Sequence, residues 1–257
     1  MTWTALVLAG SRGGEDPVAR AAGVPHKAMA TVAGRRMIDH VIDALNASQQ
    51  VGQIVICGPE DLPLPPGTSL LPTASTPASS VLAALEDLGT PLLITTADNP
   101  LLSAKTLTMF LDQAGQSNAD AVAAVAPREV AEQAGNPGRR TYLKFRDTAV
   151  SGCNLFAILT PAGRAAPAFW RRLEVQRKKP WRMALSIGPW ALIQYALGRL
   201  TLDAAAKAIA AKAGCRAAII RLTDPYAPHD VDKPEDLVFV EQILSRSTPD
   251  EHGKGGA

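Results

Sequence analysis

The sequence predicts an α/β protein built on a single doubly wound, mostly parallel sheet, with a helical insertion near its C-terminus. Short apolar runs alternate with stretches of helical periodicity along most of the chain, and the connections between them are short. With 257 residues, 47% of them hydrophobic, the chain can bury a full core. We expect one domain over 1–245 and a disordered, polar tail over 246–257.

The first elements follow from the apolar pattern. Residues 4–9 (TALVLA) form a short apolar run that Gly10 ends, as expected for a buried parallel strand. Apolar residues recur at helical spacing in "MIDHVIDAL", which predicts an amphipathic helix over 37–45. Residues 53–58 (QIVICG) repeat the strand pattern, and the prolines and glycine of 63–67 indicate a loop.

The alternation continues through the middle of the chain. A helix is expected over 79–89, where Gly89 ends it, followed by a strand over 91–97. The next helix, over 103–114, has Ser103 as its N-cap. Later strands are expected at 119–126, 154–159 and 217–222, and a last helix at 234–244. A ligand site in such a sheet lies outside the carboxyl ends of the strands, so the residues that follow strands are the candidates.

Composition excludes several classes of protein. The net charge of +2 provides no global field for nucleic acid, so no nucleic-acid partner is expected. Cys57, Cys153 and Cys215 are odd in number and far apart, which fits free thiols in a reducing cytoplasm better than disulfides or a zinc site. No secretory signal is evident, and the longest apolar-leaning stretch, 183–197, is too short to span a bilayer. We therefore expect a cytoplasmic protein.

The stretch after the first strand, "LAGSRGGEDPVARAAGVPHK", has the features of an anion-binding loop. Gly10 lets backbone N–H groups approach an anion, and Arg12, Arg20 and Lys27 supply positive charge, a combination that suits a polyphosphate. The alternative is an ordinary surface loop with scattered charges, because a G-x-x-G pattern is weak by itself.

Two later segments place carboxylates after strands. In "TTADNPLL", Asp98 follows a strand and can ligate Mg²⁺ through oxygen, although Asp-Asn-Pro also fits simple turn chemistry. In "HDVDKPEDL", Asp232 with Glu235 fits a helix capping box with Pro234 in the first turn. Asp230 has no such structural role and is the better candidate for a second metal ligand.

Taken in order, these segments resemble the MobA-like NTP transferase family, within the GT-A-like nucleotidyltransferases that include sugar-phosphate and alcohol-phosphate nucleotidyltransferases. The resemblance lies in "LVLAGSRG", "HKAMATVAGRRMIDHVIDAL", "STPASSVLAAL", "ITTADNPLL", "SGCNLFAI" and "HDVDKPEDL", which run in family order to about residue 244. It implies a GT-A-like fold and transfer of NMP from an NTP, CTP or GTP, to a phosphorylated small-molecule acceptor, with Mg²⁺ as cofactor and pyrophosphate as product.

The resemblance also implies roles for individual residues. Lys27 matches the lysine that neutralises the phosphates, and Arg12 and Arg20 compete for the position of the arginine. The chain departs from the family pattern at Ser11, where a second glycine is usual, and in the extra residues of "GEDPVARAAGVPH". Nucleotide contacts are implied for Leu8, Ala9, Gly10, Ser11, Ser79 and Ser80; acceptor contacts for Gly152 and Asn154; and metal ligation for Asp98 with Asp230 or Asp232.

Ser79 has a structural alternative as a helix cap. For the chemistry, a phosphate nucleophile is already ionised at neutral pH, so the implied reaction needs no general base. Two other functions remain open: a metal-dependent glycosyltransferase of the same fold, and a nucleotide-binding sensor without catalysis.

The helical insert at about 161–214 mixes aromatic residues and cations. They are Phe169, Trp170, Trp181 and Trp190 with Arg171, Arg172, Arg177, Lys178, Lys179 and Arg182. This mixture fits contact with an anionic membrane surface, which would place the protein at the inner face of the membrane. It also fits a helical cap whose aromatic residues pack on the sheet or on a second copy in a homodimer.

Overall fold

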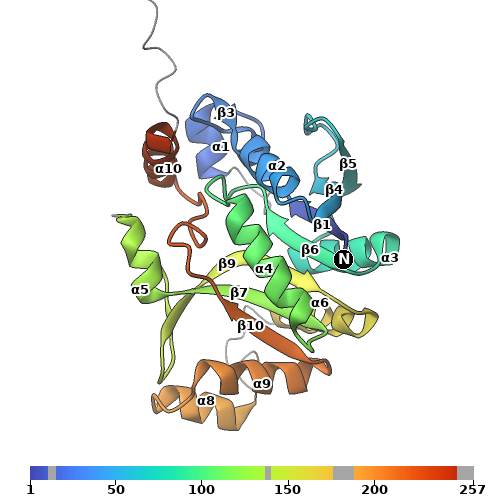
Figure 1. Ribbon diagram of the computed structural model, residues 1–257, viewed down its shortest axis with the longest axis vertical. Coiled ribbons are helices and arrows are strands. Elements are labelled where there is room, and N and C mark those ends of the chain that lie inside the picture. The colour runs from blue at the N-terminus through green and yellow to red at the C-terminus, as the bar shows by residue number, and fades with distance from the viewer. Residues whose placement is uncertain (11–15, 137–139, 176–187, 248–257) are drawn as a thin grey trace, which may run out of the picture.

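The parallel strands end at one edge of a central sheet that has helices on both faces (Figure 1). The computed structural model describes residues 1–10, 16–136, 140–175 and 188–247. The strands of the main sheet are β1 (Trp3–Leu8), β4 (Val51–Gly58), β5 (Thr68–Pro72), β6 (Leu92–Thr96), β7 (Ala121–Pro127), β8 (Leu143–Lys144), β9 (Ala149–Ile158) and β10 (Ala217–Arg221). A separate small hairpin pairs β2 (Thr31–Val32) with β3 (Arg35–Arg36).

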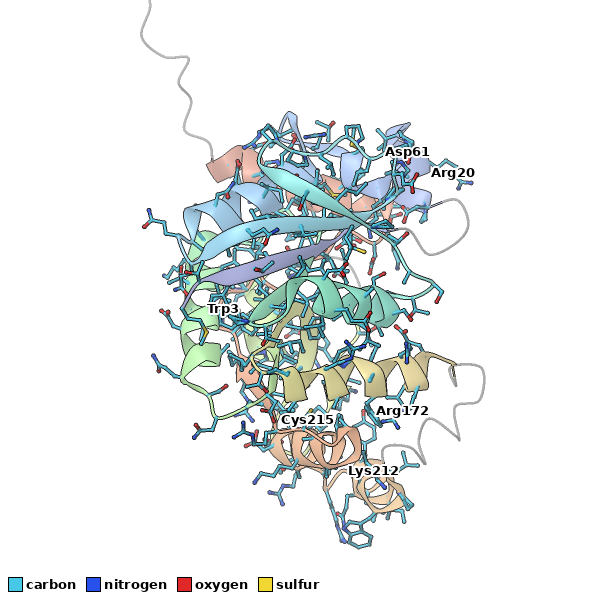
Figure 2. All side chains as sticks on the ribbon, turned by 90° about the vertical axis from the view of Figure 1, so that its right-hand side faces the viewer. Trp3, Arg20, Asp61, Arg172, Lys212 and Cys215 are labelled. Atoms are coloured by element: carbon cyan, nitrogen blue, oxygen red, sulfur yellow. The ribbon has the colours of Figure 1, made fainter. Side chains whose placement is uncertain are left out.

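Helices connect most of these strands. They are α1 (Pro17–Ala22), α2 (Met37–Ala47), α3 (Pro77–Leu88), α4 (Ala104–Gln116), α5 (Arg128–Ala131), α6 (Ala165–Val175), α8 (Pro189–Ala196), α9 (Leu202–Ala213) and α10 (Pro234–Ser247). Short 3₁₀ turns form η1 (Lys27–Met29), η2 (Glu132–Ala134) and η3 (Pro161–Arg164). Helices α2 and α4 contact each other, and α3 contacts α6 on the other side of the sheet (Figures 1 and 2).

The strand order β10-β7-β9-β6-β1-β4-β5 confirms the predicted mostly parallel sheet. The strand pairs around β1 are parallel, as is the pair β10 and β7, whereas β9 runs antiparallel to both β6 and β7. Because β9 is reversed, its first half lies at the edge where the parallel strands end. This reversal brings residues from the start of β9 to the expected ligand edge.

The core explains why these segments are strands and helices. Ala5 and Val7 of β1 face the α2 and α4 side, whereas Leu6 faces α3, as the two-residue period of a strand requires. Both faces are buried, which is why the sequence of β1 is an almost continuous apolar run.

Several details differ from the sequence-based expectations. β5 lies in a stretch for which no strand was predicted, and α1 lies inside the stretch that was expected to be a loop throughout. The insert between β9 and β10 is helical, with α6, α8 and α9, although residues 176–187, which hold Arg177, Lys178, Lys179, Trp181 and Arg182, lie outside the described part. α10 extends to Ser247, so the start of the predicted tail is helical.

Candidate active site

Three segments that the sequence singled out meet at the carboxyl edge of the sheet. The ends of β1 and β6 are neighbours, and the N–H of Ala97 donates to the carbonyl of Leu8 at 3.0 Å. The N–H of Val231 donates to the carbonyl of Asp98 at 2.8 Å, which joins the "TTADNP" turn to the "HDVD" segment. The amide of Asn99 is buried and donates to the carbonyl of Ala227 at 2.8 Å, which makes the same connection a second time.

Lys27 connects the first loop to these carboxylates. Its Nζ donates to Oδ2 of Asp98 at 2.7 Å and to Oδ1 of Asp232 at 3.2 Å. The side chains of Lys27 and Asp98 are 17% and 21% exposed, whereas that of Asp232 is 68% exposed. Burial lowers the pKa of Lys27, but Asp98 and Asp232 outweigh burial and raise it, so the ammonium stays charged.

Asp230 is held from both sides. Its Oδ1 accepts from Nη2 of Arg140 at 3.2 Å, and its Oδ2 accepts from Nδ2 of Asn154 at 2.9 Å. Burial, and then the negative charges of Asp232 and Asp98, raise the pKa of Asp230 above its usual value. The three carboxylates therefore share one electrostatic environment.

The backbone of Asn154 has an unusual conformation. Its φ is +48°, in the left-handed region that L-residues other than Asn, Asp and Gly rarely adopt. The pairing of β9 with β7 shifts register here, between the Ala123 and Val125 pairs, so β9 bulges beside the site. The bulge turns the Asn154 amide toward Asp230, and asparagine suits this position because it adopts the left-handed conformation more readily than most residues with a Cβ.

Sequence reasoning missed two parts of this network. Arg140 donates to Ser151 as well as to Asp230, at 3.2 Å in each case. The buried imidazole of His229 lies within 3.1 Å of the Asn136 amide, and burial followed by the Arg140 charge lowers the pKa of His229 to about 4. No motif marks Arg140 or Asn136, because both lie in a loop whose place depends on the tertiary fold.

The first loop is partly described. Leu8 ends β1, the N–H of Ala9 donates to the carbonyl of Cys57 at 2.8 Å, and Gly10 follows at the surface. A Cβ on Gly10 would come within 2.7 Å of the Thr73 methyl group, which is a packing reason for glycine there. Ser11 and Arg12 lie outside the described residues.

Arg20 lies on α1 and is exposed (Figure 2). Asp16 caps α1 by accepting from the N–H groups of Val18 and Ala19, and Pro17 opens the helix. The residues that are additional to the family pattern thus include a capped helical turn, which ends before Lys27 begins η1.

Two predicted helix caps are wrong. Thr76 caps α3, accepting from the N–H of Ser79, because Pro77 occupies the first helical position. Ser79 and Ser80 lie in the first turn; the hydroxyl of Ser80 is buried and accepts from the N–H of Ala74 at 2.9 Å.

The cap of α10 differs in the same way. The Asp236 carboxylate, and not that of Glu235, accepts from the N–H groups of Asp232 and Lys233. Among the described residues, the side chain of Asp232 accepts from Lys27 and from no N–H group of α10. Asp232 therefore contacts Lys27 and does not have the capping role that the sequence favoured for it; both Asp230 and Asp232 stay candidates for the second metal ligand.

Gly152 lies on β9, exposed and with open space around it. It is separated by one residue from Asn154, whose amide already contacts Asp230. Of the two predicted acceptor residues, Asn154 thus contacts a carboxylate of the site, and Gly152 precedes it on β9.

The carboxylate oxygens of the site suit a cation whose coordination is completed by oxygens of the substrate. Within the part of the chain that the structure describes, the buried Oδ1 of Asp98 accepts no hydrogen bond, so it keeps a free lone pair beside Lys27. Within the described ranges, no three His, Cys, Asp or Glu side chains are arranged to hold a metal by themselves. Mg²⁺ is commonly held by one or two carboxylates together with substrate phosphates, and Asp98 with Asp230 or Asp232 fits that pattern.

Comparison with known proteins agrees with this arrangement. The family model for the MobA-like NTP transferase domain matches residues 5–218. A structure described as a hypothetical transferase from Thermus thermophilus is 29% identical and covers 92% of this chain and 100% of its own, with a TM-score of 0.81. No curated protein matches the chain in sequence.

Two more distant structures share the fold. The 2-C-methyl-D-erythritol 4-phosphate cytidylyltransferase from Thermus thermophilus is 17% identical, covers 95% of this chain and 100% of its own, and has a TM-score of 0.55. A CMP:2-keto-3-deoxy-manno-octonic acid synthetase in complex with CTP is 12% identical, covers 96% of this chain and 100% of its own, and has a TM-score of 0.56. Among the described helices, none is long and apolar enough to cross a membrane.

Proposed function

Since this chain belongs to the MobA-like NTP transferase family, we propose that it transfers the NMP group of an NTP to a phosphorylated small-molecule acceptor and releases pyrophosphate. An oxygen of the acceptor phosphate attacks the α-phosphorus of the NTP. The bond from the α-phosphorus to the bridging oxygen breaks, and pyrophosphate leaves with that electron pair. The site must therefore hold two anions together and stabilise the charge that develops between them.

The observation that carries the proposal is the meeting of Lys27, Asp98 and Asp232 beside the end of β1. Lys27 is a charged, mostly buried ammonium at the end of the first loop, so it suits the β- and γ-phosphates of a bound NTP. Two arginines are candidates for the triphosphate. Arg20 lies on α1, in the segment between β1 and Lys27, and Arg12 lies outside the described residues.

We propose that Asp98, with Asp230 or Asp232, holds Mg²⁺ when the NTP is bound. Mg²⁺ in that place would polarise the α-phosphate and balance its negative charge. The free lone pair of Asp98 supports this assignment. Arg140 and Asn154 keep the Asp230 carboxylate in one orientation, because each donates to a different oxygen of it.

The nucleotide is proposed to be CTP or GTP. CTP comes first in the test, because the two distant fold relatives are named as a cytidylyltransferase and as a synthetase bound to CTP. The acceptor is proposed to meet the opposite side of the site, near Gly152 and Asn154, because both lie on the bulged start of β9.

The test is a matrix of the four NTPs against phosphorylated sugars and alcohols, scored by Mg²⁺-dependent release of pyrophosphate. One pair should turn over, and Lys27→Met and Asp98→Asn should each remove the activity. Lys105→Met, which removes an exposed cation on α4, is the matched control and should retain it.

NTP binding without pyrophosphate release with any acceptor would indicate a sensor. Release of a nucleoside diphosphate from a nucleotide sugar would indicate a glycosyltransferase. Either result rejects the proposal. A homodimer and a cytoplasmic location stay predictions, to be checked by sedimentation and by fractionation of cells.

A further inference from the structure

Phe156 is exposed on an interior strand of the main sheet. Strand β9 has neighbours on both sides, and Phe156 pairs with Ile94 of β6 and with Ala123 of β7. The residues before and after it, Leu155 and Ala157, are fully buried, whereas Phe156 is 42% exposed. A large apolar side chain on an interior strand normally packs under another layer of the fold, so this exposure calls for an explanation.

Helices α3 and α6 cover the same face of the sheet beside Phe156. Because successive residues of a strand face opposite sides, Phe156 shares its side with Asn154 and Ile158. Ile158 is buried in one cluster with Val81 of α3, and Ala166 of α6 packs against that cluster. The two helices therefore cover Ile158 and leave Phe156 partly open.

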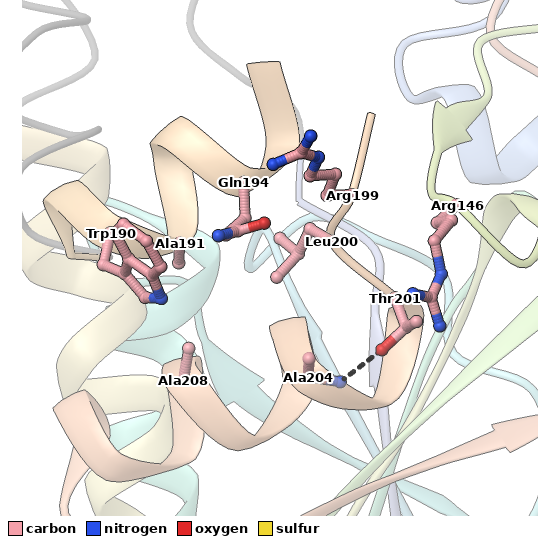
Figure 3. A pocket seen from close by; sticks show the side chains of 9 residues that line it. All are labelled: Arg146, Trp190, Ala191, Gln194, Arg199, Leu200, Thr201, Ala204 and Ala208. Carbon is pink, nitrogen blue, oxygen red and sulfur yellow. Dashed lines mark hydrogen bonds between the residues drawn. The ribbon is translucent and has the colours of Figure 1, made fainter. Parts of the chain in front are cut away.

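Helix α9 bounds the open part on the β7 side. Val125 of β7 pairs with Gly152 and is buried in a cluster with Leu202, the first residue of α9. Thr201 caps this helix by accepting from the N–H of Ala204 at 3.2 Å (Figure 3). The open part of the sheet thus lies between α9 on one side and α3 with α6 on the other.

The open part continues into the candidate active site. Asn154 lies between Gly152 and Phe156 on β9, and its amide donates to Oδ2 of Asp230 at 2.9 Å. Gly152 is exposed, and a Cβ on it would have nothing within 4 Å. We call Gly152, Asn154 and Phe156 the β9 platform. Two residues span about 7 Å along a strand, so a small molecule whose phosphate lies near Asp230 can contact Phe156 with its other end.

The platform and the strands beside it offer few hydrogen-bonding side chains. The strand residues on this side near the carboxyl edge are Ile94, Thr96, Ala123, Val125, Gly152, Asn154 and Phe156. Among these, only Thr96 and Asn154 have polar side chains, and the Asn154 amide nitrogen already donates to Asp230. A sugar with several hydroxyl groups would lose hydrogen bonds with water here and regain few, whereas an apolar group would lose none.

From this arrangement we propose that the acceptor is a phosphate monoester whose organic part is apolar or aromatic, and that Phe156 selects it by contact with that part. The inference rests on the proposed nucleotidyl transfer, because it names the class of the acceptor. Burial of apolar surface stabilises such a complex, and an aromatic part gains a stacking contact with the Phe156 ring. A second protein seated on the platform would instead cover Asn154 and Asp230 and block the candidate site.

The experiment compares two probes that carry the same phosphate group, phenyl phosphate and glucose 1-phosphate. Calorimetry measures their binding to the full chain with Mg²⁺ and the α,β-methylene analogues of CTP and GTP in turn, so no turnover is needed. Phenyl phosphate should bind the more tightly, by about tenfold. Phe156→Ala should weaken phenyl phosphate by about tenfold and leave glucose 1-phosphate unchanged, since it removes apolar contact alone.

Trp190→Ala is the matched control. It removes an aromatic side chain that is 70% exposed on α8, beside the cavity between α8 and α9 (Figure 3), and it should bind both probes as the parent does. Thermal unfolding shows whether each variant is folded. Phe156→Leu keeps an apolar side chain in the strand, and it should retain most of the affinity for phenyl phosphate.

The outcomes separate the two proposals. Tighter binding of glucose 1-phosphate, no binding of either probe, or an unchanged affinity of Phe156→Ala for phenyl phosphate would overturn the choice of acceptor class. Failure of the proposed reaction has a different result: phenyl phosphate binds through Phe156, but no pair of NTP and acceptor releases pyrophosphate.

Discussion

Replacing Asn154 tests the bulge of β9 and the support of Asp230 together. Two variants, Asn154→Gly and Asn154→Ala, both remove the amide that donates to Oδ2 of Asp230 at 2.9 Å. They differ in the backbone, because Asn154 has a φ of +48°, which glycine adopts without strain and alanine does not. The comparison therefore separates the hydrogen bond from the conformation.

The magnitudes follow from the contacts. A hydrogen bond to a charged group contributes about 1.5–3 kcal/mol, and the low end applies here because Arg140 still pairs with Asp230. The left-handed conformation costs a residue with a Cβ about 1–2 kcal/mol more than it costs glycine. Glycine loses part of this advantage, because it gives up about 0.5–1 kcal/mol more chain entropy on folding. We expect Asn154→Gly to lower the free energy of unfolding by about 1 kcal/mol, and Asn154→Ala by about 2 kcal/mol.

Urea unfolding measures stability, and pyrophosphate release with the accepted substrate pair measures activity. Both variants should lose activity to the same extent, about tenfold or more, because both leave one oxygen of Asp230 without its donor. Equal stability of the glycine and alanine variants would refute the left-handed bulge. Full activity in the glycine variant would refute the role of the amide in orienting Asp230.

Three further predictions concern other parts of the molecule. Burial lowers the pKa of His229 from 6.5 to about 4, so between these pH values the unfolded chain binds a proton that the folded chain does not. The free energy of unfolding, measured with urea, should therefore fall by about 3 kcal/mol from pH 7 to pH 4. The fall should be smaller in His229→Gln. Thr76→Ala should lower the free energy of unfolding by about 1 kcal/mol and Ser79→Ala by less, since Thr76 is the cap of α3. Chelation of Mg²⁺ should weaken NTP binding itself, and calorimetry with and without EDTA checks this.

Much of the fold could be predicted because the period of apolar residues records burial. β1, β6 and β7 are buried on both faces and read as continuous apolar runs, and α2 and α4 show one apolar side. β5 was missed because it has only one strand neighbour, β4, and its residues are partly exposed. The direction of β9 was also not predicted, because nothing in a strand's own sequence fixes which way its neighbours run.

The candidate site was predictable where a residue follows a strand. Asp98, Lys27 and the "HDVD" segment carry local signals, and they meet as expected. Arg140 carries no such signal, since it comes from a loop that only the antiparallel path of β9 brings near. The capping error at Asp232 has a physical cause: Asp236 satisfies the N–H groups at the start of α10 in place of Asp232 and Glu235.

The charges of the site bear on the proposal that the NTP and a divalent cation bind together. Among the described residues that these contacts join, Asp98, Asp230 and Asp232 are three acidic groups and Lys27 and Arg140 two basic ones, an excess of one acid. A triphosphate that binds alone is repelled by this excess of acidic groups. Lys27 can contact the phosphates only if it gives up part of its ion pair with Asp98. A cation that arrives with the NTP would resolve both conflicts, because the free lone pair of Asp98 can bind it while Lys27 moves to the phosphates.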